Sequence, residues 1–341
     1  MIMDWRKELD KELAALDHDK TFVLTDSNVA DLFDCPGVRI VVPAGEGSKD
    51  VGRLVEIWRI LTESGATRRS ILVNIGGGVV SDLGGFAAAT FKRGIRYINV
   101  PTTLLAMADA SIGGKTGIDF DGYKNEVGAF RMPERVIVDG AWLRTLGPEL
   151  LADGLAEVVK SAMLGSRLEY ESLLDMQGEL NAESLGHAAE WSARFKEEVV
   201  TQDPTEQGLR RILNLGHTAG HAFESLAAGL GSPVGHGTAV AHGLLVSLIL
   251  SQELCGLPGN CAGIYADRIL KRYYSPLPNG VLDIPALMEL MRHDKKNPKQ
   301  GEIAFVLLRN ISEPVECVVP GALCIEAALS MYESIVCSLY Q

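Results

Sequence analysis

The chain has 341 residues, enough for two domains with a sizeable hydrophobic core. Hydrophobic residues make up 47% of the sequence and charged residues 22%, a balance typical of globular enzymes. The formal net charge of -12 argues against nucleic acid as a partner, because binding to nucleic acid requires a basic face that neutralises phosphates. Any basic site for an anionic substrate must therefore be local.

Six cysteines are scattered along the chain without a CxxC pair, which argues against a cysteine-based zinc site. Such thiols in a chain of this length indicate a reducing compartment, so we expect a cytoplasmic protein. The first residues are charged and amphipathic and lack the apolar stretch of a signal peptide. The longest apolar run, near residues 239–250, is too short to span a bilayer, and we expect no membrane association.

The first part of the chain alternates short apolar segments with helical patterns. Four strands are predicted, at residues 21–25, 38–42, 70–75 and 96–100. Strands that alternate with helices indicate a doubly wound, mostly parallel sheet of the Rossmann-like class. Helical periodicity dominates after about residue 142, and only residues 303–308 fit a strand. We therefore expect an α/β domain of residues 1–142 and an all-α domain of residues 143–341.

A glycine turn, Gly76-Gly77-Gly78, joins the third predicted strand to a predicted helix. In this context backbone N–H groups and a helix N-terminus can hold a pyrophosphate. The turn is not a strict GxGxxG motif, because Ser81 stands where the third glycine would be. Asp26 and Asn28 follow the first strand, where they could bind sugar hydroxyls or cap the next element. From these two residues alone, capping is the favoured interpretation.

Residues 113–116, Gly-Gly-Lys-Thr, resemble the end of a Walker A loop. The first glycine of that motif would fall at position 109, which is Asp109, and a carboxylate there would repel a phosphate. The sequence therefore disfavours a P-loop NTPase.

Two histidines four residues apart, His217 and His221, lie in a segment whose apolar positions fit a helix from about residue 209. On a helix this spacing places both imidazoles on one face. Arg210 and Asn214 share the same spacing. Position 218 is Thr where an HExxH zinc motif would have Glu, so ordinary hydrogen-bonded core histidines are the alternative interpretation.

Two further residues extend this pattern toward a metal site. His236 lies at the start of an apolar helical run, and Glu157 lies in an earlier helical segment. One glutamate and two histidines with an open position are a common catalytic zinc set.

Taken together, these motifs resemble the 3-dehydroquinate synthase family, within the sugar phosphate cyclases. The resemblance extends from Asp26 to the Asp294-Lys295-Lys296 cluster. The family's motifs occur in order and near their usual spacing, at 76–79 with Asp82, 101–103, 109–116, 124–125, 157–160 and 214–221. Two positions depart from the family pattern, since Thr238 stands where the family usually has Glu and Leu150 replaces an expected carboxylate.

The resemblance implies NAD and a metal ion, zinc or cobalt, as cofactors. It implies that the metal ion binds to Glu157, His217 and His236. The implied NAD-binding residues are Asp26, Asn28, Glu46, Lys49, Gly77, Gly78, Val79, Asp82, Thr102, Thr103, Lys115 and Lys124. The implied substrate-binding residues are Arg93, Lys124, Asn125, Lys196, Arg210, Lys295 and Lys296. The implied catalytic residues are Asp109, Lys115, Lys160, Asn214 and His221.

The implied reaction is the cyclisation of 3-deoxy-D-arabino-heptulosonate 7-phosphate to 3-dehydroquinate with release of phosphate, a step of the shikimate pathway toward aromatic amino acids. In the family, the arginine that matches Arg93 reaches the phosphate of the neighbouring subunit, so a homodimer is implied. The presence of Lys196, Arg210, Asn214 and His221 favours this substrate. The alternatives are another sugar phosphate cyclase, a metal-dependent alcohol dehydrogenase of the glycerol dehydrogenase type, and a non-catalytic scaffold that binds NAD or zinc.

Overall fold

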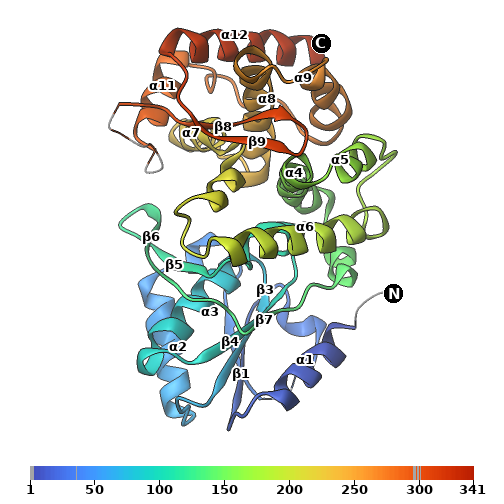
Figure 1. The fold of residues 1–341 in the computed structure, drawn as a ribbon. Helices are drawn as coiled ribbons and strands as arrows, with labels where there is room; N and C mark the ends of the chain where they lie inside the picture. The colour runs from blue at the N-terminus through green and yellow to red at the C-terminus, as the bar shows by residue number, and fades with distance from the viewer. Residues whose placement is uncertain (1–3, 36, 295–296, 298, 300) are drawn as a thin grey trace. The chain divides into compact units, whose positions relative to one another are not determined.

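The computed structural model describes residues 4–35, 37–294, 297, 299 and 301–341. The chain divides into two compact units. The first unit comprises Met1–Leu151 and Leu180–Glu198, and the second comprises Ala152–Glu179 and Val199–Gln341. In Figure 1 the sheet of the first unit runs from blue to green, and the last helices of the second unit are orange and red.

The first unit is built on a five-stranded parallel sheet. Its strands are β1 (Thr21–Asp26), β2 (Val38–Val42), β3 (Ile71–Gly76), β4 (Arg96–Pro101) and β7 (Arg135–Val136), in the spatial order β2-β1-β3-β4-β7. The central strand β3 is buried along its whole length and pairs in parallel with β1 and β4. The four strands predicted from the sequence are confirmed to within one residue, and so is the parallel sheet class.

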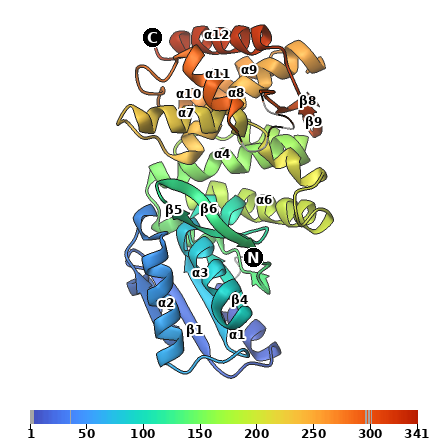
Figure 2. The same cartoon turned by 90° about the vertical axis from the view of Figure 1, so that its left-hand side faces the viewer.

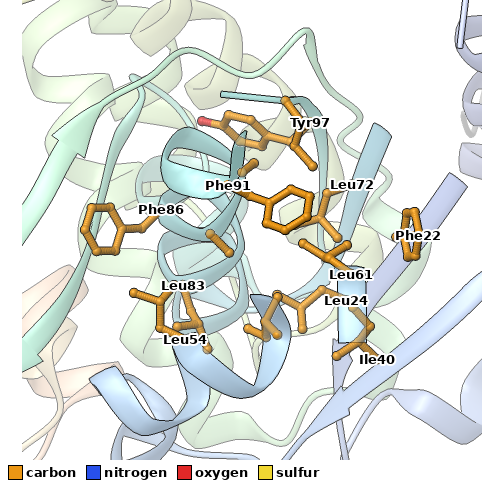
Figure 3. Close-up of a cluster of buried hydrophobic side chains, with 14 of the residues drawn as sticks. Phe22, Leu24, Ile40, Leu54, Leu61, Leu72, Leu83, Phe86, Phe91 and Tyr97 are labelled. Atoms are coloured by element: carbon orange, nitrogen blue, oxygen red, sulfur yellow. The ribbon is translucent and has the colours of Figure 1, made fainter. Parts of the chain in front are cut away.

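Helices cover both faces of this sheet. Figures 1 and 2 show α2 (Val51–Glu63) and α3 (Gly78–Thr90) on one face and α1 (Trp5–Ala15) on the other. The core between α2, α3 and the sheet is a cluster of buried apolar side chains (Figure 3). Leu54 and Leu61 of α2, Leu83 of α3, and Phe22 and Leu72 of the strands belong to it. Because α3 is buried on most sides, its first turn is held firmly at the end of β3.

An antiparallel hairpin of β5 (Lys115–Phe120) and β6 (Tyr123–Phe130) follows β4 in the chain and was not predicted. Most residues of β6 are exposed, so the strand lacks the alternation of apolar and polar residues that identifies a half-buried strand. Lys115 is the first residue of β5, so the Gly-Gly-Lys-Thr segment enters a strand and not a helix. A π-helix, Ala106–Ala110, precedes the hairpin and contains Asp109.

The second unit is largely helical. Its helices are α5 (Arg167–Leu174), α7 (His217–Gly229), α8 (His236–Cys255), α9 (Cys261–Tyr265), α10 (Lys271–Tyr273), α11 (Ile284–Arg292) and α12 (Ala322–Leu339), and α4 (Pro148–Gly165) and α6 (Ala182–Gln202) cross the boundary between the units. The expectation of a helical second domain is confirmed, and the unit also contains an antiparallel hairpin of β8 (Phe305–Asn310) and β9 (Glu313–Val318). β8 confirms the strand predicted near residues 303–308.

Two helices of this unit, α8 and α12, are long and apolar enough to cross a membrane by length and composition. The sequence argument took the apolar run of α8 to end near residue 250, whereas the helix has 20 residues. In α8, 72% of the apolar window is buried inside the structure, so α8 is a core helix and is apolar on all sides for that reason. In α12 the buried share is 28%, and Ile325, Leu329 and Tyr332 are among its buried residues.

Candidate functional site

Helix α7 begins at His217, directly after a turn at Gly216 that separates it from the preceding helical segment. Gly216 has a φ of 80°, in the left-handed region, and a side chain there would lie 2.9 Å from Leu244. The preceding segment, Leu209–Asn214, is a 3-10 helix, so the predicted continuous α-helix from residue 209 is wrong. His217 and His221 do share a face of α7, and their ring centroids lie 5.3 Å apart.

Three predicted metal ligands meet inside the second unit. Glu157 on α4 has no exposed surface. The Nε2 atoms of His217 and His236 each lie 3.5 Å from Glu157 Oε1, and one ligand atom of each residue lies within 4.8 Å of the others. In a tetrahedral zinc site with bonds of about 2.0–2.1 Å, neighbouring ligand atoms are about 3.3 Å apart. The spacing therefore fits one divalent cation bound by all three side chains.

Both imidazoles are also held through Nδ1, the ring nitrogen that does not face Glu157. His217 Nδ1 lies 3.2 Å from the carbonyl oxygen of Leu215, and His236 Nδ1 lies 3.1 Å from Glu224 Oε2. With a proton on each Nδ1, the lone pair of each Nε2 is available to a metal ion. Burial lowers the pKa of His236, but Glu157 and Glu224 outweigh it and raise the pKa to about 10. The two carboxylates beside His236 therefore favour positive charge. A metal ion and a proton compete for the same ring nitrogen.

Two further predicted residues surround the cluster. Lys160, one turn after Glu157 on α4, is buried, and its Nζ contacts Glu157 Oε2. His221 is partly exposed, and its Nδ1 lies 3.7 Å from Asp294 Oδ2. The ring of His221 lies 6.0 Å from the ring of His236. Both residues thus lie next to the three predicted metal ligands.

The Gly235-His236-Gly237 segment is explained by the close approach of α4 to α8. Asp153, one turn before Glu157 on α4, accepts a hydrogen bond from the Gly237 N–H at 2.6 Å and so caps α8, whose N-cap residue is Gly235. A Cβ on Gly237 would lie 1.7 Å from the Asp153 carbonyl oxygen. The backbone N–H of Thr238 also bonds to Asp153, so this departure from the family pattern keeps its backbone contact.

Arg210 lies on a loop that Asp203 organises. The Asp203 carboxylate accepts hydrogen bonds from the backbone N–H groups of Gln207 at 2.9 Å, Gly208 at 2.8 Å and Arg210 at 3.0 Å. These hydrogen bonds lower the pKa of Asp203, because they stabilise its charged form. The Arg210 guanidinium donates to the carbonyl oxygen of Pro204 at 2.8 Å, which fixes its direction.

Asn214, at the end of the same segment, is oriented through its amide nitrogen. This nitrogen donates to Glu206 Oε1 at 2.9 Å and to the Arg211 carbonyl oxygen at 3.1 Å. Glu206 has a φ of 60°, an uncommon conformation for a residue other than glycine. A carboxylate held in this way fixes which end of the Asn214 amide can face a ligand.

In the first unit, the glycine turn stands at the N-terminus of α3 as predicted. Gly77 is the N-cap residue, and a Cβ there would lie 3.1 Å from the Thr103 side chain. A Cβ on Gly78 would lie 3.2 Å from Ala110 Cβ. The two glycines therefore let Thr103 and Ala110 pack closely against the first turn of the helix. Thr102 is buried, and its N–H bonds to the Gly76 carbonyl oxygen at 2.9 Å, which joins the ends of β4 and β3.

A buried lysine joins several of the other predicted cofactor residues. Lys49 Nζ lies 2.7 Å from Asp82 Oδ2, 3.6 Å from Glu46 Oε1 and 2.5 Å from Asn125 Oδ1. Burial raises the pKa of Asp82 to about 6, against the opposing effect of the Lys49 charge. The cluster brings three residues predicted for NAD together with Asn125, which was predicted for the substrate.

Lys196 and Asp109 form a second polar pair in the first unit. Lys196 Nζ donates to the Asp109 carbonyl oxygen at 2.8 Å and to its carboxylate at 2.6 Å. Lys196 is buried on α6, and Asp109 lies in the π-helix after β4. Single π-helical turns are frequent at functional sites. Two predicted residues far apart in the sequence are thus brought into direct contact.

Asp26 and Asn28 adopt the cap that the sequence favoured. Asp26 ends β1, and its Oδ1 accepts the Asn28 N–H at 2.8 Å. Thr103 also caps locally, since its hydroxyl accepts the Ala106 N–H at 3.2 Å.

The remaining predicted residues are basic. Arg93 is exposed at the turn after α3, with a φ of 69°. Lys115 and Lys124 lie on β5 and β6. Lys295 and Lys296 lie outside the described residues.

Four supporting carboxylates were not predicted. Asp153, Asp203, Glu206 and Glu224 each hold a predicted residue or its segment in place. Two of them carry a signal in the sequence, because Asp153 precedes Glu157 by one helical turn and Glu224 follows His217 by two turns on the same face. Glu206 carries no such signal, since it lies in an irregular loop.

The parallel sheet and the largely helical second unit define the dehydroquinate synthase-like fold. A 2-deoxy-scyllo-inosose synthase complexed with carbaglucose-6-phosphate, NAD+ and Co2+ matches with a TM-score of 0.81 and 21% identity, over 96% of this chain and 95% of that chain. ValA (2-epi-5-epi-valiolone synthase) from Streptomyces hygroscopicus, with NAD+ and Zn2+ bound, matches with a TM-score of 0.79 and 25% identity, over 94% of this chain and 92% of that chain.

Sequence comparison narrows this class to one family. Residues 39–153 match the family model of the 3-dehydroquinate synthase N-terminal region, and residues 154–297 match that of the C-terminal region. The 3-dehydroquinate synthase of Parabacteroides distasonis is 44% identical over 323 residues, which cover 91% of this chain and 90% of the relative. The chain belongs to the 3-dehydroquinate synthase family, which confirms the resemblance seen in its motifs.

Proposed function

We propose that the protein converts 3-deoxy-D-arabino-heptulosonate 7-phosphate to 3-dehydroquinate with release of phosphate, in the shikimate pathway. The proposal is carried by the Glu157, His217 and His236 cluster, in a chain that is 44% identical to a curated 3-dehydroquinate synthase. When bound, zinc or cobalt would act as a Lewis acid on a substrate hydroxyl, and NAD would accept and return a hydride.

In this proposal the metal ion binds to Glu157, His217 and His236, which supply one carboxylate and two imidazoles. The 3.5 Å distance from Glu157 Oε1 to the Nε2 atom of each histidine supports it. Lys160 and His221 act beside the ion. Lys160 orients an oxygen of the substrate, and His221 exchanges a proton with a hydroxyl, since an imidazole can both donate and accept a proton.

The substrate carries a carboxylate and a phosphate, whereas the whole chain has a formal net charge of -12. Recognition of the substrate therefore needs positively charged side chains that are held in fixed positions. Arg210, whose guanidinium is directed by the Pro204 carbonyl oxygen, can bind a carboxylate or phosphate in bidentate fashion. Lys196 is held by Asp109, and we assign to Lys115, Lys124, Asn125, Lys295 and Lys296 the substrate contacts that the family resemblance implies.

We assign NAD to the first unit. The N-terminus of α3 at Gly77 and Gly78 would hold the pyrophosphate, because N–H groups there point outward and the helix dipole favours negative charge. Lys49 and Asp82 provide polar contacts next to this turn. We keep the division of labour in which residues 1–142 are the NAD-binding domain and residues 143–341 are the metal- and substrate-binding domain.

We further propose a cytoplasmic homodimer in which Arg93 contacts the phosphate bound by the partner subunit. The exposure of Arg93 supports this assignment, since its side chain is accessible to a partner subunit.

The test is phosphate release from the heptulosonate phosphate by the full-length protein. Release is expected to require NAD, to stop with a chelator, and to return with zinc or cobalt, while no NADH accumulates. Net NADH formation would indicate an alcohol dehydrogenase instead, and bound ligands without phosphate release would indicate a scaffold. Another sugar phosphate cyclase would leave this substrate unchanged and turn over a different one; the lower identity to the two solved synthases, 21% and 25%, disfavours this alternative.

A further inference from the structure

Glu224 lies on α7 and reaches a histidine of another helix. Its Oε2 atom is 3.1 Å from Nδ1 of His236, the first residue of α8. The opposite ring nitrogen, Nε2, lies 3.5 Å from Glu157 Oε1. His236 therefore sits between two carboxylates, one of which is in the proposed ligand set and one of which is not.

We infer that Glu224 is a positioning residue of the metal site: it accepts the Nδ1 proton of His236, so that the ring is fixed and Nε2 is presented to the cation. The inference rests on the proposed function only for the presence of a divalent metal ion. A carboxylate in this position fixes the tautomer and the ring orientation and makes the imidazole a stronger ligand.

The two proposed histidine ligands differ in what holds them. His217 Nδ1 lies 3.2 Å from the Leu215 carbonyl oxygen, which belongs to its own segment and is fixed by the turn at Gly216. His236 opens its helix between Gly235 and Gly237, two residues without side chains that could restrict its ring. A side chain from another helix therefore has to set the orientation of this imidazole.

The charge on Glu224 adds to the effect of its geometry. A hydrogen bond to a carboxylate is roughly twice as strong as one to a neutral acceptor. Glu224 therefore places a second carboxylate beside His236, in addition to Glu157. Glu224 lies two turns after His217 on the same face of α7, so this one helix carries a proposed ligand and also the carboxylate that orients the other histidine.

The test is the zinc affinity of the purified full-length protein, measured by competition with a chromophoric chelator. Glu224→Ala is expected to bind zinc about ten- to a hundredfold more weakly than wild type, the usual effect of losing such a carboxylate. Glu224→Gln keeps an acceptor but loses the charge, so a loss of several-fold is expected. The control is Glu253→Ala, an exposed position near the other end of α8, about 25 Å along the helix, where affinity should not change.

A second readout separates positioning of the ligand from general loss of structure. The absorption spectrum of the cobalt-loaded protein reports ligand geometry, and it is expected to change in Glu224→Ala and to stay as in wild type in Glu253→Ala. Wild-type affinity and spectrum in Glu224→Ala would overturn the inference. Should Glu224→Ala not fold, the folded Glu224→Gln variant decides by the same measurements, since weaker zinc binding supports the inference and wild-type affinity overturns it. A wild-type protein that takes up no zinc or cobalt would refute the proposed function as well, and is thereby distinguished from failure of the Glu224 inference alone.

Discussion

Gly237→Ala is expected to separate α4 from α8 and so to disrupt the metal site. The added Cβ would lie 1.7 Å from the carbonyl oxygen of Asp153, and its next contacts, at 2.5 and 2.7 Å, are also Asp153 backbone atoms. Backbone atoms cannot relieve such a clash by a change of rotamer, as the end of a flexible side chain can. The two helices must therefore move apart by more than about 1 Å, at a cost of about 1–3 kcal/mol or more in the free energy of unfolding.

This displacement acts directly on the proposed ligands. Asp153 and Glu157 lie one turn apart on α4, and His236 precedes Gly237 on α8, so the shift stretches the distance between Glu157 and His236. A metal site tolerates changes of only about 0.2 Å in its bond lengths. We therefore expect zinc affinity to fall by about a hundredfold or more, beyond the ten- to hundredfold effect typical of a supporting residue.

Zinc titration against a chelator and thermal unfolding measure the two effects. Gly229→Ala is the matched control, because a Cβ at the end of α7 would have no neighbour within 4 Å. The control is expected to retain the zinc affinity and stability of wild type. A folded Gly237→Ala variant that binds zinc as tightly as wild type would refute the argument that the approach of α4 to α8 builds the site.

Three further predictions concern charge, substrate and metal. Burial raises the pKa of Asp82 from its ordinary 3.8 to about 6 in the folded protein. Between these two pH values the folded protein holds a proton that the unfolded chain has lost. As pH rises from 3.8 to about 6, wild type should therefore lose up to about 3 kcal/mol of stability relative to Asp82→Asn. Denaturant unfolding at several pH values measures this difference, and the opposite slope would show that the ion pair with Lys49 outweighs burial. Lys196→Ala is expected to raise KM for the sugar phosphate about tenfold or more while NAD affinity stays within about twofold, because it removes a charged hydrogen-bonding group; equal losses in both assays would count against its assignment. Chelation should abolish phosphate release but leave the circular dichroism spectrum unchanged, and release that persists in the chelated protein would contradict the metal assignment.

The buried strands of the first unit could be predicted because each gives a local signal. All six residues of β3 are buried, which produces an apolar run broken only by Asn74 and ending in glycine. β5, β6 and β9 give no such signal, since their residues are largely exposed or interrupted by glycine, and Pro314 lies inside β9. These strands form two-stranded antiparallel hairpins, in which pairing does not require a buried face.

A turn with positive φ and a long-range contact explain the other differences between the sequence predictions and the structure. The predicted helix from residue 209 failed at Gly216, because the periodicity of apolar residues does not reveal a positive φ. Nothing local indicates that Leu180–Glu198 joins the first unit, where Lys196 meets Asp109 across 87 positions of sequence. Such a contact depends on the whole fold.

The candidate site could be predicted in its chemistry but not in its support. The residue types of Glu157, His217 and His236, with the family resemblance, pointed to a metal site, and the structure brings their ligand atoms together. Asp153 and Glu224 were missed because a carboxylate on a helix is most often a solvated surface residue. Only the tertiary structure shows that each reaches the start of α8.

The central claim is that one divalent cation binds to Glu157, His217 and His236. Anomalous X-ray diffraction at the zinc edge, from crystals of the zinc-loaded protein, tests it most directly. The account predicts one strong peak within about 2.0–2.2 Å of a Glu157 carboxylate oxygen and of the Nε2 atoms of both histidines. A zinc peak elsewhere in the chain, with none among these three side chains, would contradict it.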